Sequence, residues 1–303
     1  MISIKILGLG EITTTIALEG ALDHRHPQTG RRVAWAYKRL PSFPSEAEAI
    51  AFQQLSADYQ QALEKAGIRL LFQRARLIRS QGKIWVYICQ ERLPSNTIAS
   101  RAIGPAPVEE CRQIFGRVLI ELLKIYTWNR DHPELRLGFD GQIPNWAVLD
   151  DGPLGYFDTS TPLLRRDGRE GLNTELFLKA VPILLRPVVR AFLLQGIVDR
   201  YYDPRLVTLD LIASFYTFRR PDAVPALVAD ANRFLQDRMT AFQLAPYTIA
   251  EIRSYNRSDL LLWKFLRAMK RMDRFITQEI LGRSYEQRLP QDRKAEQEIR
   301  GSR

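Results

Sequence analysis

The expected architecture follows from one stretch of the chain, Leu137-Gly-Phe-Asp-Gly-Gln-Ile-Pro-Asn-Trp-Ala-Val-Leu-Asp-Asp-Gly-Pro-Leu-Gly-Tyr-Phe-Asp158. It opens with a loop rich in Gly and Pro that carries Asp140 and Asn145, and two short apolar runs follow. Between these runs Asp150-Asp-Gly152 predicts a tight turn, because Asp-Gly supplies the positive φ that hairpin turns need. A hairpin brings its end back to its start, so we expect Asp158 to lie close to Asn145 and Asp140.

The three polar residues of this hairpin suit one kind of chemistry. A carboxylate and an amide oxygen on neighbouring strand ends can hold Mg²⁺, an ion that prefers few protein oxygens together with phosphate oxygens. This predicts Asn145 and Asp158 as metal ligands. A second carboxylate on the loop, Asp140, can orient a hydroxyl group and accept its proton as the oxygen attacks a phosphoryl group.

The order Asp140-x-x-x-x-Asn145, hairpin, Asp158 resembles the catalytic loop and metal-binding aspartate of the protein-kinase-like fold. The likeness is closer to the small-molecule branch of that fold, the aminoglycoside phosphotransferases and choline kinases. Two positions depart from the pattern. Gly138 stands where those enzymes usually carry His, and Thr159-Ser-Thr161 stands where protein kinases have Phe-Gly. A hairpin with these polar residues also occurs in other α/β proteins, so the order of elements along the chain carries the rest of the resemblance.

The N-terminal segment predicts a strand, a glycine turn and a returning strand. The runs Ile2–Leu7 and Glu11–Leu18 flank the turn Gly8-Leu-Gly10. In the kinase-like fold such a turn covers the nucleotide phosphates with backbone N–H groups and hydroxyls. The resemblance gives this nucleotide-binding role to Gly8, Gly10, Thr13 and Thr14. An ordinary hairpin turn explains the same residues when the segment is taken alone.

A third strand is expected at Val33–Leu40, with Lys38 near its end. Strand alternation places Ala34, Ala36 and Lys38 on one face, where the two alanines leave room for an adenine ring. The resemblance implies that Lys38 meets the α and β phosphates of the nucleotide. A surface lysine at a strand end is the plainer alternative.

A capping box at Ser45-Glu-Ala-Glu48 predicts a helix that runs to about Lys65. The kinase-like fold pairs an acid on this helix with the strand lysine. Glu48, Glu46 and Asp58 are the candidates, and Glu48 is also the capping residue. The resemblance places Glu48 in the nucleotide site through this pairing.

Two more strands, Ile68–Ile78 and Lys83–Cys89, are expected before a connector between two lobes. In the kinase-like fold, backbone groups of this connector meet the edge of the adenine ring. The resemblance therefore implies nucleotide contacts from Gln90, Glu91 and Leu93.

The rest of the chain is expected to be mostly helical. Apolar residues recur every three or four positions over Val108–Trp128 and predict a long buried helix. The segment Thr159–Gly171 should be irregular and basic, and its Arg165, Arg166 and Arg169 either meet an anionic substrate or lie in solvent. Further helices are expected over 173–198, kinked at a proline, and over 206–216, 223–242 and 249–281, with a flexible charged tail after about 287.

The amino-acid composition limits which classes of protein this chain can belong to. A chain of 303 residues with 46% hydrophobic content can bury a substantial core. Its net charge of +10 favours an anionic partner, such as a nucleotide, a phosphorylated metabolite, nucleic acid or acidic lipid. Two cysteines without metal-ligand spacing indicate a reducing, cytoplasmic location, and three histidines argue against a zinc site. We expect neither a signal peptide nor a membrane span.

Together these features predict an α+β, bilobal protein-kinase-like fold. Residues 1–92 would form an N-lobe with a five-stranded antiparallel sheet and one helix, and residues 93–303 a mostly helical C-lobe. The resemblance implies a kinase that uses Mg²⁺ and transfers the γ-phosphoryl group of ATP to a hydroxyl of a small molecule. In this reaction Asp140 would act as the catalytic base.

Two other functions stay open at this stage. The first is a pseudokinase, an inactive module of the same fold that binds a nucleotide or a partner. The second is a basic nucleic-acid-binding protein, suggested only by the net charge and an arginine-rich C-terminal helix. This second alternative is less favoured, because basic residues on a helix more often form a solvated face. The sequence leaves the acceptor, ATP versus GTP, and the oligomeric state open.

Overall fold

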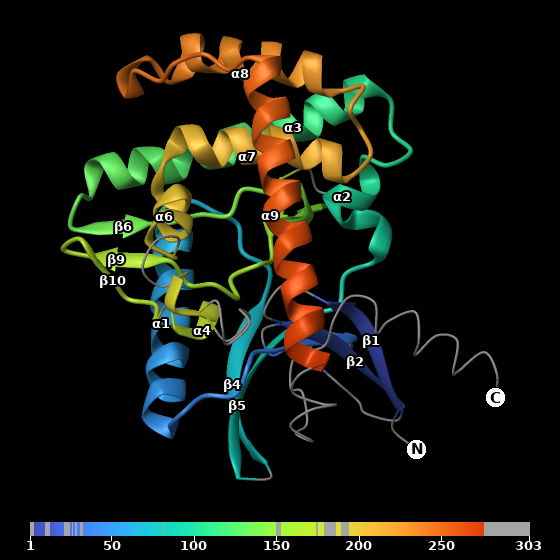
Figure 1. The fold of residues 1–303 in the computed structure, drawn as a ribbon, viewed down its shortest axis with the longest axis vertical. Coiled ribbons are helices and arrows are strands. Elements are labelled where there is room, and N and C mark those ends of the chain that lie inside the picture. The colour runs from blue at the N-terminus through green and yellow to red at the C-terminus, as the bar shows by residue number, and fades with distance from the viewer. Residues whose placement is uncertain are drawn as a thin grey trace.

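The computed structural model describes residues 3–9, 13–20, 25, 27, 29–30, 33–80, 82–149, 153–173, 175–178, 186–188 and 194–275. Gly10, the turn Asp150–Gly152 and the charged tail lie outside these residues. The described chain is α+β, as expected. A five-stranded antiparallel sheet lies at the lower end of Figure 1 and helices fill the upper end.

The sheet has the strand order β1-β2-β3-β5-β4, and every neighbouring pair is antiparallel. The predicted sheet of five antiparallel strands is therefore confirmed. The strands span Ser3–Leu9 (β1), Thr14–Glu19 (β2), Trp35–Arg39 (β3), Gln73–Ser80 (β4) and Lys83–Glu91 (β5). On β3 the expected alternation is present, because Ala36 and Lys38 are buried while Trp35, Tyr37 and Arg39 are half-buried.

Helix α1 (Glu46–Lys65) begins at the predicted capping box. The Ser45 side chain accepts a hydrogen bond from the backbone N–H of Glu48 at 3.2 Å, which satisfies one of the unpaired donors of the first turn. The helix packs against β4 and β5. Its buried face includes Phe52, Tyr59 and Leu63.

Helices α3 (Val108–Asp131), α7 (Pro204–Thr217) and α8 (Val224–Arg238) form the core at the other end (Figure 1). Asp203 caps α7 by accepting from the N–H groups of Arg205 and Leu206. Helix α9 (Ile249–Phe275) packs on α7 and extends in Figure 1 toward the level of the sheet. Within the described residues, no helix combines the length and apolar character needed to cross a bilayer.

The predicted hairpin forms from β7 (Trp146–Val148) and β8 (Leu154–Tyr156). Its aromatic residues Trp146 and Tyr156 are fully buried, with ring centroids 5.0 Å apart. The backbone of Tyr156 exchanges two hydrogen bonds with the segment before β4, at Arg69 and Leu71. This pairing explains why β4 begins at Gln73 and not at the expected Ile68: the preceding residues bond to the hairpin instead.

The expectation that Thr159–Gly171 is irregular is wrong. The segment contains strands β9 (Leu164–Arg166) and β10 (Arg169–Glu170), which form a three-stranded sheet with β6 (Leu135–Leu137). Asp167 and Gly168 join β9 to β10 with φ values of 49° and 75°. This Asp-Gly pair is itself a hairpin signal of the same kind as Asp151-Gly152.

The remaining short elements connect these parts. The predicted helix over 173–198 is described only in three pieces, and its other residues lie outside the described chain. The bounds are Ala99–Ala102 (α2), Glu175–Leu178 (α4), Arg186–Val188 (α5) and Leu194–Asp199 (α6), with single 3-10 turns at Ser95–Thr97, Ile143–Asn145, Arg200–Tyr202 and Thr240–Phe242.

Gly138 lies where the structure has no room for a side chain. A Cβ at this position would come within 2.8 Å of the Tyr202 ring and of the Leu163 Cβ. The Gly138 carbonyl accepts a hydrogen bond of 2.8 Å from the Tyr59 hydroxyl on α1. The structure therefore has no space at residue 138 for the His that the resemblance would place there, since Tyr202 and Leu163 occupy it.

We expect Gly138→Ala to lower the free energy of unfolding by about 1–3 kcal/mol, because the added methyl group overpacks a closed site. Gly116→Ala is the matched control. Its Cβ meets nothing within 4 Å on α3, so it should stabilise the protein by up to about 1 kcal/mol. Urea denaturation of both variants measures the difference, and equal midpoints would contradict the steric explanation.

Candidate active site

The centre of the site is an ion pair between the sheet and the hairpin. The Lys38 Nζ on β3 lies 3.0 Å from the Asp158 Oδ1, which follows β8. The same carboxylate oxygen accepts from the backbone N–H of Ser160 at 3.1 Å and from its hydroxyl. Burial on its own would raise the pKa of Asp158, but the positive charge of Lys38 and the Ser160 hydrogen bonds outweigh it and hold that pKa below its usual value.

The N-terminal strands β1 and β2 lie in register with Lys38. Gly8 on β1 is the partner of Thr15 on β2, and Thr15 is in turn the partner of Lys38 on β3. Gly8, Thr13 and Thr14 are half-buried. The structure therefore brings the described part of the predicted glycine turn to the same end of the sheet as the lysine, about one to two strand spacings away.

The loop residues Asp140 and Asn145 are held to the hairpin by three hydrogen bonds. The Asn145 Nδ2 donates to the Asp140 carbonyl at 3.2 Å, and the Tyr156 hydroxyl donates to the same carbonyl at 3.2 Å. The backbone N–H of Phe157 donates to the Asn145 carbonyl at 3.1 Å. Asp158 thus returns beside Asn145 and Asp140, as the hairpin was expected to bring it.

The Asp140 carboxyl group is electrostatically unusual. Burial and the nearby Asp210 carboxylate, with a further contribution from Asp158, raise its pKa from 3.8 to about 7. A hydrogen bond of 3.2 Å from the Gln142 N–H acts in the opposite direction and is outweighed. A carboxyl group with a pKa near neutrality can exchange a proton at physiological pH.

A small cavity lies beside Asp140, with a volume of about 10 Å³ that suits one water molecule. Asp210 on α7 and Arg200 are among the residues that line it. The Asp210 carboxylate accepts from the Gln142 Nε2 at 2.6 Å and from the Tyr255 hydroxyl at 2.9 Å. The Arg200 guanidinium donates to the Tyr255 hydroxyl at 3.1 Å. Asp210 on α7 and Arg200 therefore form one wall of the cavity, and Tyr255 on α9 supports this wall through its bonds to both side chains.

Sequence reasoning missed these wall residues. Asp210 had a detectable signal, because it is a carboxylate inside a helix whose neighbours are almost all apolar. Arg200 and Tyr255 had none, because nothing in the local sequence shows that Tyr255 meets Asp210 and Arg200 across 45 and 55 residues of chain.

The acids expected to pair with Lys38 have other partners. Glu46 forms an ion pair with Arg79, and Asp58 forms one with Arg166 at 2.7 Å. Glu48 lies beside Ser45 in the capping box and accepts from the Asn173 side chain at 3.2 Å. These helix residues are therefore engaged with other side chains, and Lys38 pairs with Asp158 instead.

The end of β5 carries the predicted connector residues. Gln90 and Glu91 are the register partners of Ala36 and Trp35, and Leu93 follows the strand and is half-buried. The Gln90 side chain is buried on the sheet face that also carries Lys38. Its side chain, and not only its backbone, therefore faces the site.

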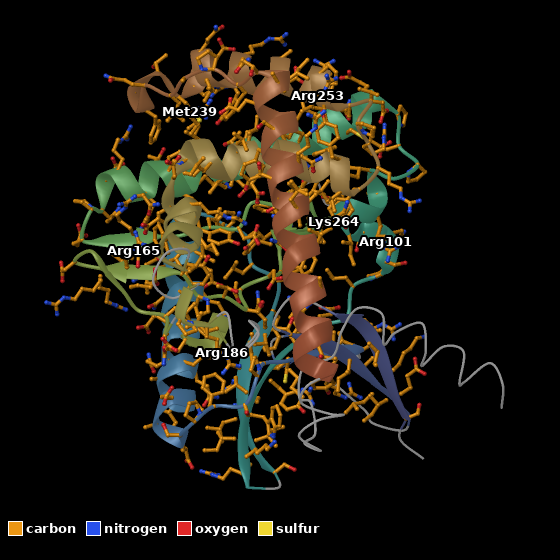
Figure 2. All side chains as sticks on the ribbon, in the orientation of Figure 1. Arg101, Arg165, Arg186, Met239, Arg253 and Lys264 are labelled. Carbon is orange, nitrogen blue, oxygen red and sulfur yellow. The ribbon has the colours of Figure 1, made fainter. Side chains whose placement is uncertain are left out.

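Two of the three arginines that were expected either to meet an anionic substrate or to lie in solvent form ion pairs. The Arg165 guanidinium contacts the carboxylates of Glu170 and Asp199, beside β9 in Figure 2. Arg166 meets Asp58, and Arg169 is exposed. These positions support a structural role for Arg165 and Arg166.

The sequence from residue 25 to residue 274 matches a protein family described as a family of unknown function, DUF6206. The chain belongs to this family. No curated protein matches the sequence. The part of the DUF6206 chain that matches includes Lys38, Asp140, Asn145 and Asp158, whereas Gly8 and Thr13 precede it.

The raised pKa of Asp140 predicts a pH-dependent effect of Asp140→Asn on thermal stability. The folded protein holds this proton up to about pH 7, whereas the unfolded chain releases it near pH 4. The stability from protonated Asp140 is therefore present at low pH and is lost as the pH rises to about 7. We expect Asp140→Asn to melt a few degrees (about 2–8 °C) above the wild type at pH 8, with a smaller difference at pH 5.5.

Asp237→Asn is the control for this measurement, because Asp237 is exposed on α8. Scanning fluorimetry from pH 5.5 to 8.5 should show no pH trend in its melting temperature relative to the wild type. An Asp140→Asn difference that stays constant with pH would contradict the raised pKa.

Proposed function

We propose that this DUF6206 protein is a Mg²⁺-dependent phosphotransferase that transfers the γ-phosphoryl group of ATP to a hydroxyl group of a small molecule. One observation carries the proposal. The buried Lys38 meets Asp158 at 3.0 Å, and the hairpin that ends in Asp158 begins at Asn145, whose amide is bonded to Asp140. A cation for phosphates, oxygen ligands for a metal and a titratable carboxylate thus converge from three segments.

The arrangement of elements supports the kinase-like part of the proposal. Five antiparallel strands and one long helix precede a mostly helical remainder, which is the order that the resemblance implies. In the proposed bilobal fold the sheet and α1 would cover the nucleotide, and the helical part would bind the acceptor. The expected cytoplasmic location belongs to the same proposal.

The oxygen atoms near the hairpin fit a magnesium ion bound together with phosphate. All three hydrogen bonds to the Asp158 carboxylate end on Oδ1, which leaves Oδ2 for a cation. Asn145 donates through Nδ2, which leaves its Oδ1 to accept. In the described part of the chain no cluster of three or more His, Cys, Asp and Glu side chains can hold a metal, which agrees with an ion that relies on substrate oxygens.

The residues have distinct roles in the proposed reaction. Asp140 accepts the proton of the acceptor hydroxyl, a task that suits a carboxylate with a pKa of about 7. Lys38 neutralises charge on the nucleotide phosphates. Asn145 and Asp158 would hold Mg²⁺, which offsets phosphate charge when it is bound. The cavity beside Asp140, which Asp210 and Arg200 line, would take only the hydroxyl group of the acceptor.

A pseudokinase is the second candidate, and one observation favours it. Within the described residues Lys38 pairs with Asp158, and none of Glu46, Glu48 and Asp58 on α1 reaches it. The kinase-like pattern expects such a helix acid. A protein of this kind would bind Mg-ATP without turning it over.

We expect purified protein to show a thermal shift with Mg-ATP and slow release of phosphate from it. Asp140→Asn should reduce phosphate release by at least about 10²-fold and keep the thermal shift, because it removes only the base. Lys38→Met should weaken ATP binding as well. The control Lys65→Met changes an exposed lysine at the end of α1 and should behave as the wild type.

The outcomes separate the candidates. Binding without any phosphate release selects the pseudokinase. Protein that neither binds nor hydrolyses Mg-ATP excludes both nucleotide functions.

A further inference from the structure

Two glutamines sit opposite each other in the sheet with unsatisfied amide groups. Gln73 on β4 and Gln90 on β5 are register partners, and each is only 7% exposed. Both amide atoms of Gln73 and the Oε1 of Gln90 are sealed from solvent and have no hydrogen-bond partner among the described residues. More than nine in ten buried polar groups in folded proteins have a partner, so three unpaired atoms at one place call for an explanation.

The glutamine pair lies in a row of small residues. Ala17 on β2 is the partner of Ala36 on β3, Ala36 is the partner of Gln90, and Gln90 is the partner of Gln73. Ala17 and Ala36 are buried and carry only a methyl group each. This row therefore offers a flat apolar surface that ends in two amide groups, a combination that suits one face and one edge of a planar heterocycle.

The row is next to the lysine of the proposed phosphate site. Lys38 is the partner of Ile88, and Gln90 follows two residues later on the same face of β5. One strand spacing across and two residues along correspond to about 8 Å between the Cα atoms of Lys38 and Gln90. One nucleotide can therefore place its phosphates at Lys38 and its base at Gln90.

We propose that Gln90 binds the adenine base through its side-chain amide and that the unpaired amide of Gln73, its register partner, adds a second polar contact at the edge of the base. This inference rests on the nucleotide site proposed above and adds the recognition of the base. A glutamine amide offers one donor and one acceptor, which match the amino group and ring nitrogen of adenine in a bidentate contact. The terminal torsion of glutamine is broad, so the amide turns Oε1 to the ligand without movement of the backbone.

The test compares three probes, Mg-ATP, Mg-GTP and Mg-tripolyphosphate, which has no base. Titration calorimetry should give the wild type an affinity for ATP at least about tenfold above that for GTP and tripolyphosphate. Gln90→Leu should weaken ATP binding about 10- to 100-fold, bring the ATP-to-GTP ratio near one and leave tripolyphosphate binding unchanged. Gln73→Leu should reduce the same ratio by a smaller factor.

Two further variants keep the test decisive. Gln90→Glu has the same shape without the amide donor, so it should also lower the ATP-to-GTP ratio if a Leu variant folds poorly. Gln236→Leu, on the exposed side of α8, is the control and should leave all three affinities unchanged.

Each failure points to a different conclusion. ATP affinity that is unchanged in Gln90→Leu and Gln90→Glu overturns the inference and leaves the amides as hosts of a buried water. Equal affinities of the wild type for ATP and tripolyphosphate overturn base recognition but keep the proposed phosphate site. If no probe binds, the proposed function itself fails and this inference fails with it.

Discussion

The structure around the candidate site depends on neutralising one buried cation. A lysine ammonium group that is removed from water is costly unless an opposite charge lies beside it. Lys38 is 7% exposed, and Asp158 supplies that charge at 3.0 Å. Tyr156, two residues earlier, is bonded through its backbone to the segment before β4 and helps to hold Asp158 in this position. The ion pair and this backbone pairing together hold the hairpin against the sheet.

The fold was predictable where its signals are local. The capping box at Ser45, the apolar periodicity of α3 and the two strands around Asp150–Gly152 depend on residues within a few positions of one another. The same kind of signal is present at Asp167-Gly168, within a segment that is rich in arginine. Charge says little about strand formation when each arginine has a carboxylate partner, as Arg165 has in Glu170 and Asp199.

The site was predictable only in part, because the partner of each charged side chain depends on which opposite charges lie near it in the folded structure. Spacing along the chain gave Asp140, Asn145 and Asp158 as neighbours, since a hairpin fixes their separation. Spacing did not predict the partner of Lys38, because the acids of α1 bind other basic or capping residues, such as Arg79 for Glu46. Tyr255 meets Asp210 and Arg200 from positions 45 and 55 residues away in the chain, and no local pattern predicts these contacts.

The ion pair also bears on how a nucleotide would enter the proposed site. A phosphate group brings negative charge for Lys38, and its magnesium ion brings positive charge for Asp158. Binding would therefore exchange the partner of each buried group and leave neither uncompensated, which avoids the large cost of stripping one charge from a buried pair. The same electrostatic effects act on the Asp140 carboxyl group, but here the neighbouring charges are negative. Its pKa is raised by burial and by the negative charges of Asp210 and Asp158, so a cation bound at Asp158 would ease its ionisation and favour the form that accepts a proton.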